Sequence, residues 1–420
     1  MKRSTRTMRL ASIAAASALV LAACGGGDDD DSDDGGSASS EADGVLTIGS
    51  LLPQTGSLAF LGPPEFAGVD LAVNEINEAG GVLGEDVVHV KGDSGDTDSG
   101  IAPDETDKLL DAGSDVIVGA AASGVSMTVI DKIMGSGTVM FSPANTSTDF
   151  DEGDYAEPDL YFRTAPSDVL QGAVLSNLLI QDGKQNVAIL ARQDSYGETL
   201  AEEVGNGLEA AGSNVAATVF YGENAQSYDS QVQEVAQADP DAVLLIAFEE
   251  TKTIIPQLVQ AGVGPQDADT YFVDGNMADY SGDLDDGILE GTKGTLPGAE
   301  AAGDFRDRLL EVDPDLKDFT YAGESYDAVV VSALAAIAAD TDAGDAIAEE
   351  IPGITRDGEK CTTFADCKDL LEAGEEIDYD GASGPIELGE TGSPTSASIG
   401  IYEYKSDNTY EAVEYIEGTI

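Results

Sequence analysis

The chain has 420 residues, enough for two or three domains, and 42% of them are hydrophobic. It carries 19 lysines and arginines against 81 aspartates and glutamates, a formal net charge of -62. Such a surface repels nucleic acids and anionic lipids, so nucleic-acid binding is excluded as a function. The same charge favours a saline habitat, because salt screens the repulsion between carboxylates.

The number of histidines excludes further classes of enzyme and metal site. His89 is the single histidine, whereas Ser-His-Asp hydrolases, two-histidine zinc sites and facial-triad iron sites need histidines in defined places. The stretch Gly-Asp-Ser-Gly at 92–95 resembles the nucleophile loop of trypsin-like proteases, with Ser94 five residues from His89. The surrounding pattern is α/β rather than a double β-barrel, so we expect no enzyme, cofactor or metal site.

The first 23 residues have the features of an export signal. Four basic residues come first, and the apolar run at 10–23 is too short to span a bilayer. The run leads into Leu-Ala-Ala-Cys at 21–24, which resembles a bacterial lipobox whose cysteine receives a diacylglyceryl anchor. We therefore expect a lipoprotein signal peptide at 1–23, lipidation of Cys24, and a mature protein anchored at the extracytoplasmic face of the cell membrane.

Residues 24–44 consist mostly of Gly, Ser and Asp and have almost nothing to bury, so we expect a solvated tether. Part of this tract fits the spacing of an EF-hand calcium loop. No amphipathic helix precedes it, however, and so acidic a tract matches carboxylate patterns easily. We therefore predict no calcium site there.

From residue 45 short aliphatic runs alternate with amphipathic stretches of ten or more residues, which is typical of parallel βαβ units. A first series has expected strands at 45–52, 87–91, 116–119 and 139–142, and expected helices at 64–79, 103–112 and 125–134. A second series has expected strands at 187–190, 215–221, 242–247 and 270–273, and expected helices at 168–181, 198–211, 227–238 and 251–261. The fold class is therefore α/β, with two Rossmann-like lobes in tandem.

The C-terminal part combines helices with a hairpin. We expect helices at 299–312 and 321–339, the second buried on most of its surface, and a hairpin within 385–420 that turns at 405–409. Cys361 and Cys367 flank a short loop, and outside the cell a disulfide is the expected state of such a pair. Closing so small a loop constrains local geometry more than it stabilises the whole chain.

Six motifs follow one another along the chain: LLPQTG at 51–56, AVNEINEAGGV at 72–82, FSPANT at 141–146, FRTAPSD at 162–168, DSYG at 194–197 and YDGASGP at 379–385. In this order and spacing they resemble the branched-chain amino-acid binding proteins of ABC importers, the type I periplasmic binding family. The resemblance covers nearly everything from residue 45 onward.

The resemblance implies a flytrap, two lobes joined by three hinge crossings near 163–166, 292–297 and 378–384. Lobe 1 would take 45–163 plus 298–376, and lobe 2 would take 164–291 plus part of 385–420. We expect a monomer that captures a small branched-chain-like amino acid or a related amide and delivers it to an ABC permease. A ligand-sensing lipoprotein of the same fold, signalling to a membrane sensor, remains the alternative.

Ligands of open α/β sheets bind where strands end and helices begin. Ser123 follows one expected strand, and we expect it to cap the next helix and bind a ligand carboxylate. After the next strand, the Ala144 carbonyl and Thr146 hydroxyl resemble the family's acceptors for an α-ammonium group. Ser123 and Thr146 as plain helix caps are the alternative.

The second lobe would close over the ligand. Tyr196 and Asp274 match the closing positions, and Asp274 would pair with the ammonium group. Leu61 and Phe60 stand where the family lines the side-chain pocket. The alternatives are interlobe packing for Tyr196 and a surface position for Asp274.

Two further pairs of residues bear on the ligand. Glu249 and Glu250 fall where some family members place a cleft tyrosine, and a carboxylate in the cleft would favour a cationic or amide-bearing ligand. Glu324 and Tyr326 start the expected buried helix and are further candidates to reach the cleft.

Overall fold

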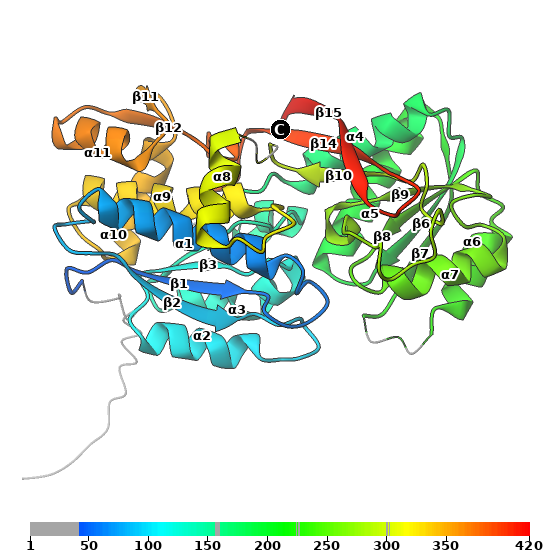
Figure 1. The fold of residues 1–420 in the computed structure, drawn as a ribbon, viewed down its shortest axis with the longest axis horizontal. Helices are drawn as coiled ribbons and strands as arrows, with labels where there is room; N and C mark the ends of the chain where they lie inside the picture. Colours follow the sequence, from blue (N-terminus) through cyan, green and yellow to red (C-terminus); the bar gives the residue numbers. More distant parts are fainter. Residues whose placement is uncertain (1–41, 156–159, 224, 226, 300, 302) are drawn as a thin grey trace, which may run out of the picture. The chain divides into compact units, whose positions relative to one another are not determined.

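The computed structural model describes residues 42–155, 160–223, 225, 227–299, 301 and 303–420, which belong to one compact unit. The expected signal peptide, the Cys24 lipidation site and nearly all of the tether lie outside the described residues. Figure 1 shows two lobes, each with helices on both sides of a central sheet.

The first lobe contains a parallel sheet in the order β2-β1-β3-β4-β5. Its strands are β1 (Thr47–Leu52), β2 (Val88–Asp93), β3 (Val116–Gly119), β4 (Val139–Ser142) and β5 (Tyr161–Arg163). Its main helices are α1 (Gly62–Glu78), α2 (Ala102–Asp111), α3 (Ser123–Met134), α8 (Gly303–Val312), α9 (Ala322–Ala339) and α10 (Gly344–Ile354). Two short 3-10 turns, Thr148–Asp151 and Gly153–Tyr155, precede β5.

Alternate strand residues of this sheet face opposite helix layers. Ile48 and Val118 belong to the core shared with α1, α9 and α10, whereas Leu51 and Ile117 belong to the core shared with α2 and α3. Because both faces are covered, the inner strands β3 and β4 are apolar at nearly every position. Among the described residues α9 is the one helix long and apolar enough to cross a membrane, but 83% of it is buried inside the protein, as in a core helix.

The second lobe contains a sheet in the order β15-β14-β10-β9-β8-β6-β7. The parallel strands are β6 (Asn186–Arg192), β7 (Asn214–Tyr221), β8 (Ala242–Ile246), β9 (Asp269–Phe272) and β10 (Lys293–Pro297), and a short 3-10 turn (Asp274–Asn276) follows β9. The antiparallel hairpin β14 (Ser396–Tyr404) and β15 (Tyr410–Thr419) extends the sheet beyond β10. Helices α4 (Asp168–Gln181) and α5 (Ser195–Ala211) share one core, and α6 (Asp229–Gln237) and α7 (Thr251–Ala261) share the other.

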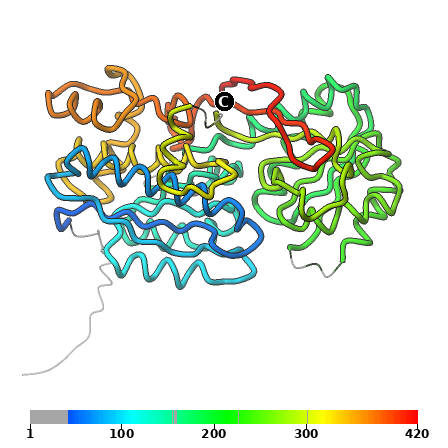
Figure 2. Tube along the Cα trace, in the orientation of Figure 1, coloured from blue at the N-terminus to red at the C-terminus, as the bar shows by residue number. Residues whose placement is uncertain are grey.

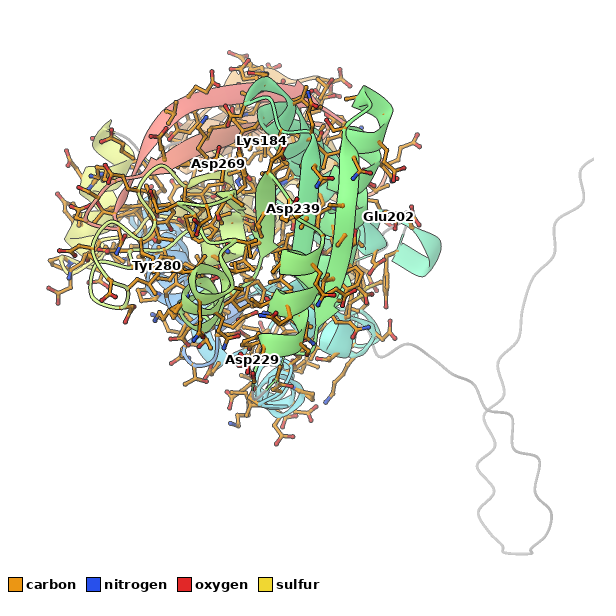
Figure 3. All side chains as sticks on the ribbon, turned by 90° about the vertical axis from the view of Figure 1, so that its right-hand side faces the viewer. Lys184, Glu202, Asp229, Asp239, Asp269 and Tyr280 are labelled. Atoms are coloured by element: carbon orange, nitrogen blue, oxygen red, sulfur yellow. A yellow bond between two sulfur atoms is a disulfide. The ribbon has the colours of Figure 1, made fainter. Side chains whose placement is uncertain are left out.

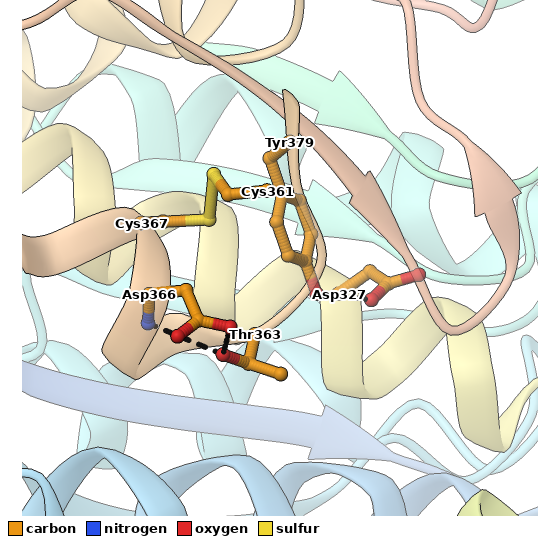
Figure 4. Close-up of a disulfide and its surroundings, with 6 residues drawn as sticks. All are labelled: Asp327, Cys361, Thr363, Asp366, Cys367 and Tyr379. Carbon is orange, nitrogen blue, oxygen red and sulfur yellow. Dashed lines mark hydrogen bonds between the residues drawn. A yellow bond between two sulfur atoms is a disulfide. The ribbon is translucent and has the colours of Figure 1, made fainter. Parts of the chain in front are cut away.

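A small third sheet, β11 (Glu359–Cys361), β12 (Ile377–Gly381) and β13 (Gly384–Pro385), packs with α11 (Phe364–Glu372). Cys361 and Cys367, the expected pair, are joined by a disulfide between β11 and α11 (Figure 4). In the loop that it closes, Thr363 caps α11 by accepting a hydrogen bond of 3.2 Å from the Asp366 N-H. The disulfide and the cap together fix where this helix begins.

The chain passes between the two sheets three times, and Figure 2 follows it through these passages close to the C-terminus. The first passage lies between β5 and α4, as expected near 163–166. The second differs from the expectation, because the residues at 292–297 include β10, which pairs with β9 and β14, so the passage follows Pro297. The third comes after β13 rather than at 378–384, since those residues form β12 and β13.

The second lobe carries many exposed carboxylates. Figure 3 looks onto this lobe and labels Glu202, Asp229 and Asp239, which are all exposed. Raising NaCl from about 0.1 M to about 1 M shortens the screening length from about 10 Å to about 3 Å. We therefore expect the thermal midpoint, measured by circular dichroism, to rise with NaCl and equally with KCl at the same ionic strength; a midpoint that neither salt changes would contradict the electrostatic cause.

Candidate ligand-binding site

A small cavity lies where strand ends of both sheets meet. Its free volume is about 10 Å³, room for about one water molecule. Ser123 follows β3, Ala144 follows β4, and Phe248 and Asp274 follow β8 and β9, so the site stands at the carboxyl ends of parallel strands. The lining residues are Leu58, Leu61, Ala121, Ala122, Ser123, Ala144, Tyr196, Phe248, Asp274, Gly275 and Tyr321.

Five of the seven predicted ligand residues line this cavity: Leu61, Ser123, Ala144, Tyr196 and Asp274. Phe60 and Thr146 are not among the lining residues. Phe60 is half-buried and packs against the core of the second lobe. Thr146 is fully buried, and its carbonyl oxygen accepts a hydrogen bond of 2.7 Å from the Asp168 N-H.

The expected helix cap at Ser123 is wrong by one position. Ser123 is already the first residue of α3, and the N-cap residue is Ala122. No side chain forms a capping hydrogen bond there, because alanine carries no acceptor. The Ser123 hydroxyl instead accepts a long hydrogen bond, 3.5 Å, from the Ser147 N-H. The first N-H groups of α3 still point out of the helix, where they suit a carboxylate.

Asp274 is the polar centre of the cavity and is 5% exposed. Its Oδ1 accepts hydrogen bonds from the Tyr196 hydroxyl at 2.6 Å and from Gln171 Nε2 at 3.0 Å. Its Oδ2 accepts one from the Tyr321 hydroxyl at 2.8 Å. Burial raises the pKa of Asp274, although these donors oppose the shift. The lining residues include no lysine, arginine or histidine, so Asp274 faces the cavity without a cation.

A second carboxyl group lies close to Asp274. Asp168, the first residue of α4, is fully buried, and its Oδ2 accepts a hydrogen bond of 3.3 Å from the Thr199 hydroxyl. Burial raises its pKa well above the usual range, and the charge of Asp274 raises it further. The two acids therefore titrate as a coupled pair that a cation in the cavity would stabilise in the ionised form.

Phe248 forms the aromatic wall of the cavity. Its ring stacks on Tyr196 with centroids 5.5 Å apart, and the Arg192 guanidinium lies 3.5 Å from its centroid. Glu250 binds Arg192 at 3.0 Å, and Glu249 is exposed and pairs with Lys252 at 2.9 Å. The expectation of an extra carboxylate in the cleft is therefore wrong, because the turn after β8 directs Phe248 inward instead.

The start of α9 contributes a residue that was not predicted. Tyr321, just before the helix, has a left-handed backbone (φ 60°) and reaches Asp274. Tyr326, a candidate from the sequence, instead donates a hydrogen bond of 2.5 Å to Glu75 within the first lobe. Glu324 does not line this cavity but two others. No sequence pattern marks a tyrosine with positive φ, so this residue was missed.

Hydrogen bonds join the lobes on either side of the cavity. Besides the bond between Tyr321 and Asp274, the Ser195 hydroxyl donates to the Ser147 hydroxyl at 2.8 Å, and the Thr97 hydroxyl donates to the Glu223 carboxylate. A cavity of about 10 Å³ is too small for an amino acid. The lining residues must therefore move apart to admit one.

The single histidine belongs to a different arrangement. The Ser94 hydroxyl contacts the Gly95 carbonyl at 3.4 Å and not His89. His89 lies instead between the Ser50 hydroxyl, 2.8 Å from Nε2, and Asp70, 2.9 Å from Nδ1. This order of groups is that of a Ser-His-Asp relay. Ser50 is 0% exposed, however, so its hydroxyl is sealed inside the lobe.

Known proteins resemble most of the described part of the chain. A family model described as "Periplasmic binding protein" matches residues 45–409. The chemotactic signal transduction system substrate-binding protein BasB of Halobacterium salinarum is 27% identical over 82% of this chain and 83% of its own length. The leucine-, isoleucine-, valine-, threonine-, and alanine-binding protein of Pseudomonas aeruginosa is 27% identical over 86% and 90%.

Solved structures share the fold. The leucine-binding protein LivK of Thermotoga maritima superposes with a TM-score of 0.72 at 22% identity, covering 89% of this chain and 99% of that one. The substrate-binding protein LivJ of Streptococcus pneumoniae, in complex with isoleucine, gives a TM-score of 0.72 at 19% identity, covering 89% and 100%. At these identities the likeness establishes the two-lobe α/β architecture.

Proposed function

The chain belongs to the periplasmic binding protein family, and on this premise we propose that it is the extracytoplasmic substrate-binding component of an ABC importer. Its ligand would be a small amino acid with an apolar side chain, held between the two lobes and handed to a membrane permease. The relatives named for leucine, isoleucine and valine support this ligand class. The chain would bind its ligand without making or breaking a covalent bond.

The observation that carries the proposal is the setting of Asp274. A buried carboxylate that faces a cavity without a cationic lining residue is suited to an ammonium group. On the opposite side, the N-terminus of α3 with Ser123 is suited to a carboxylate. The two groups therefore match the two charged ends of an amino-acid zwitterion.

The remaining wall sets the side-chain preference. Leu58, Leu61, Ala121 and Phe248 are apolar, and the two glutamates that follow Phe248 in the chain form ion pairs outside the cavity lining. An apolar wall favours a branched aliphatic side chain by excluding water, and disfavours a charged one that finds no partner. We therefore expect a cationic or amide-bearing ligand to bind more weakly than a branched-chain amino acid.

Isothermal titration calorimetry on residues 42–420 tests the proposal. We expect leucine, isoleucine or valine to bind with one site per chain, whereas arginine and glutamate do not bind. 4-Methylpentanoate, which lacks the ammonium group of leucine, and leucinamide, which lacks its carboxylate, should each bind at least about 100-fold more weakly, because each leaves one buried charged or polar group unpaired. Equal binding of leucine and 4-methylpentanoate would contradict the role of Asp274.

The anchored state is a separate part of the proposal. We propose that the chain acts as a monomer held at the membrane by a lipid on Cys24, which the lipobox-like stretch at 21–24 supports. Proteins of this family that serve ABC importers work outside the cytoplasm, which agrees with such an anchor.

Sensing is the second candidate function. The relative from Halobacterium salinarum is named for chemotactic signal transduction and covers 82% of this chain. A sensor would use the same cleft, so ligand binding does not separate the two functions. Uptake of labelled ligand by cells with and without the gene does: unchanged uptake together with lost chemotaxis would assign the sensing role.

A further inference from the structure

A second cavity, here called the connector cavity, lies among the segments that join the lobes. Thr164 and Pro166 come from the first passage, Gly298 from the second, and Ile386 and Pro394 from the third. The ends of β14 and β15 complete it, and its volume is about 430 Å³. This is within the range of small-molecule sites and far larger than the closed cavity around Asp274.

Glu324, near the start of α9, reaches this cavity. It is 5% exposed, and the Thr164 hydroxyl donates a hydrogen bond of 3.0 Å to its carbonyl oxygen. Its carboxylate lies against Gly298, where a Cβ atom would stand only 2.1 Å from Oε1. Gly298 also has a positive φ of 96°, so a larger residue there would displace the carboxylate. The backbone thus holds Glu324 between the first two passages.

Within the described residues no cation forms an ion pair with this carboxylate, although Arg306 and Lys317 line the adjoining cavity that Glu324 also reaches. The lining residues of the connector cavity include no lysine, arginine or histidine, and no ion pair to Glu324 occurs among the described residues. Glu65 of α1 lies behind it, fully buried, with neither carboxylate oxygen hydrogen-bonded within the described part of the chain. The charge of Glu324 contributes to the raised pKa of Glu65, so the two acids are neighbours. A buried carboxyl pair without a counterion is a costly arrangement in a protein interior.

The walls limit what can bind. Five lining residues are apolar: Pro166, Pro385, Ile386, Pro394 and Ala397. No group of three or more His, Cys, Asp or Glu side chains suited to a metal ion occurs among the described residues. An anion would be repelled by Glu324 and by the exposed Glu417 on β15. A positively charged head with an apolar body meets all of these conditions.

We propose that the connector cavity is a second binding site, which takes a small organic ammonium ion with its charged group against the Glu324 carboxylate and its apolar part against the proline-rich wall. Because residues of all three passages line the cavity, the occupant contacts the segments that set the relation between the lobes. It therefore differs from the amino acid of the cleft in both position and chemistry.

The test uses n-butylammonium chloride as the probe, on residues 42–420 at pH 8.5 and constant 1 M ionic strength. We expect calorimetry to show one site for n-butylammonium and no binding of n-butanol, its uncharged counterpart. Glu324→Gln should weaken the binding at least tenfold. Glu417→Gln removes the same charge from an exposed position of the same cavity and should change the affinity less than twofold.

A pH series separates this site from general attraction to an acidic surface. Burial raises the pKa of Glu324 to about 8, with Asp327 as a further cause. The other charged groups around it are Glu65, Glu417 and five residues of an adjoining cavity: Asp279, Arg306, Lys317, Asp318 and Glu411. Because the probe needs the ionised carboxylate, its affinity should rise about tenfold from pH 6.5 to 7.5 and level off above pH 8, since one proton is released per site.

Three results would overturn the proposal. They are no binding of n-butylammonium at 10 mM, equal binding by wild type and Glu324→Gln, and an affinity that is constant from pH 6.5 to 8.5. Circular dichroism checks that each variant is folded. If Glu324→Gln does not fold, Ser396→Phe supplies the second variant, because it fills the cavity from β14 and leaves Glu324 in place; unchanged binding by that variant would equally overturn the site.

Discussion

Replacing Asp274 with asparagine is expected to weaken amino-acid binding by at least about 100-fold, because the ammonium group then loses the buried carboxylate that balances it. The asparagine keeps the size of the side chain, so Tyr196, Gln171 and Tyr321 retain a polar neighbour and the fold is preserved. Calorimetry with the best-binding branched-chain amino acid measures the loss.

A matched control carries the same change at an exposed position. Asp239→Asn lies on the outer surface of the second lobe (Figure 3) and should bind as wild type does. Equal affinities for Asp274→Asn and Asp239→Asn would remove Asp274 from the site. Tyr321→Phe is informative beside them, because it frees Oδ2 of Asp274 for the ligand and is expected to change the affinity only a few-fold.

The same carboxylate gives the binding a pH dependence with a defined sign. Burial raises the pKa of Asp274 in the empty protein. An ammonium ligand binds the ionised form of Asp274. The affinity is therefore highest above this pKa and falls as the pH drops through it. In Asp274→Asn this part of the pH dependence should disappear.

Replacing Arg163 with methionine is expected to lower the free energy of unfolding by about 3–5 kcal/mol. Arg163 is 0% exposed, and its Nε donates to Ser393 at 2.7 Å. Its other nitrogens donate to the Ser147 carbonyl at 2.8 Å, the Asn145 carbonyl at 3.2 Å and the Asp151 carboxylate. Methionine fills much of the space but takes one donor from each of the four acceptors and removes the cation beside Asp151, whose carboxylate keeps hydrogen bonds from Ser167 and Ser393. Urea denaturation measures the change.

Arg306→Met is the matched control for this substitution. Arg306 is exposed and stacks on Phe319, 4.4 Å from its centroid, so its loss should cost no more than about 1 kcal/mol. Similar values for the two variants would mean that the Arg163 network contributes little. A loss confined to Arg163 would show that the loop after β4, β5 and the segment before β14 are stabilised as one unit.

The strands and most helices could be predicted because their signals are local. The fully buried runs of β3 and β4 read as short aliphatic segments at 116–119 and 139–142, and both strands have these bounds. β10 gave a different signal, since Gly294 and Pro297 in its sequence are typical of a linker. It is a strand because β14, a hundred residues later in the chain, pairs with it, and such a distant partner leaves no local pattern.

The cavity residues likewise divide into those with a local sequence signal and those without one. Leu61, Ser123, Ala144, Tyr196 and Asp274 follow from motifs or from strand ends, and the structure brings them together. Phe248 and Tyr321 depend on backbone directions that composition does not encode. In the turn after β8, the difference between Phe248 and Glu249 is one residue, and only the three-dimensional course of that turn decides which side chain enters the cleft.

The stack of Phe248 on Tyr196 has a practical consequence. The chain contains no tryptophan. An indole introduced at position 248 would be the single one in the molecule and would stand in the wall of the cleft, in contact with the Tyr196 ring and the Arg192 guanidinium. Its fluorescence emission would change when ligand replaces water at this wall, and no other tryptophan would contribute to the signal. The fluorescence of this variant would therefore report whether the cleft is occupied.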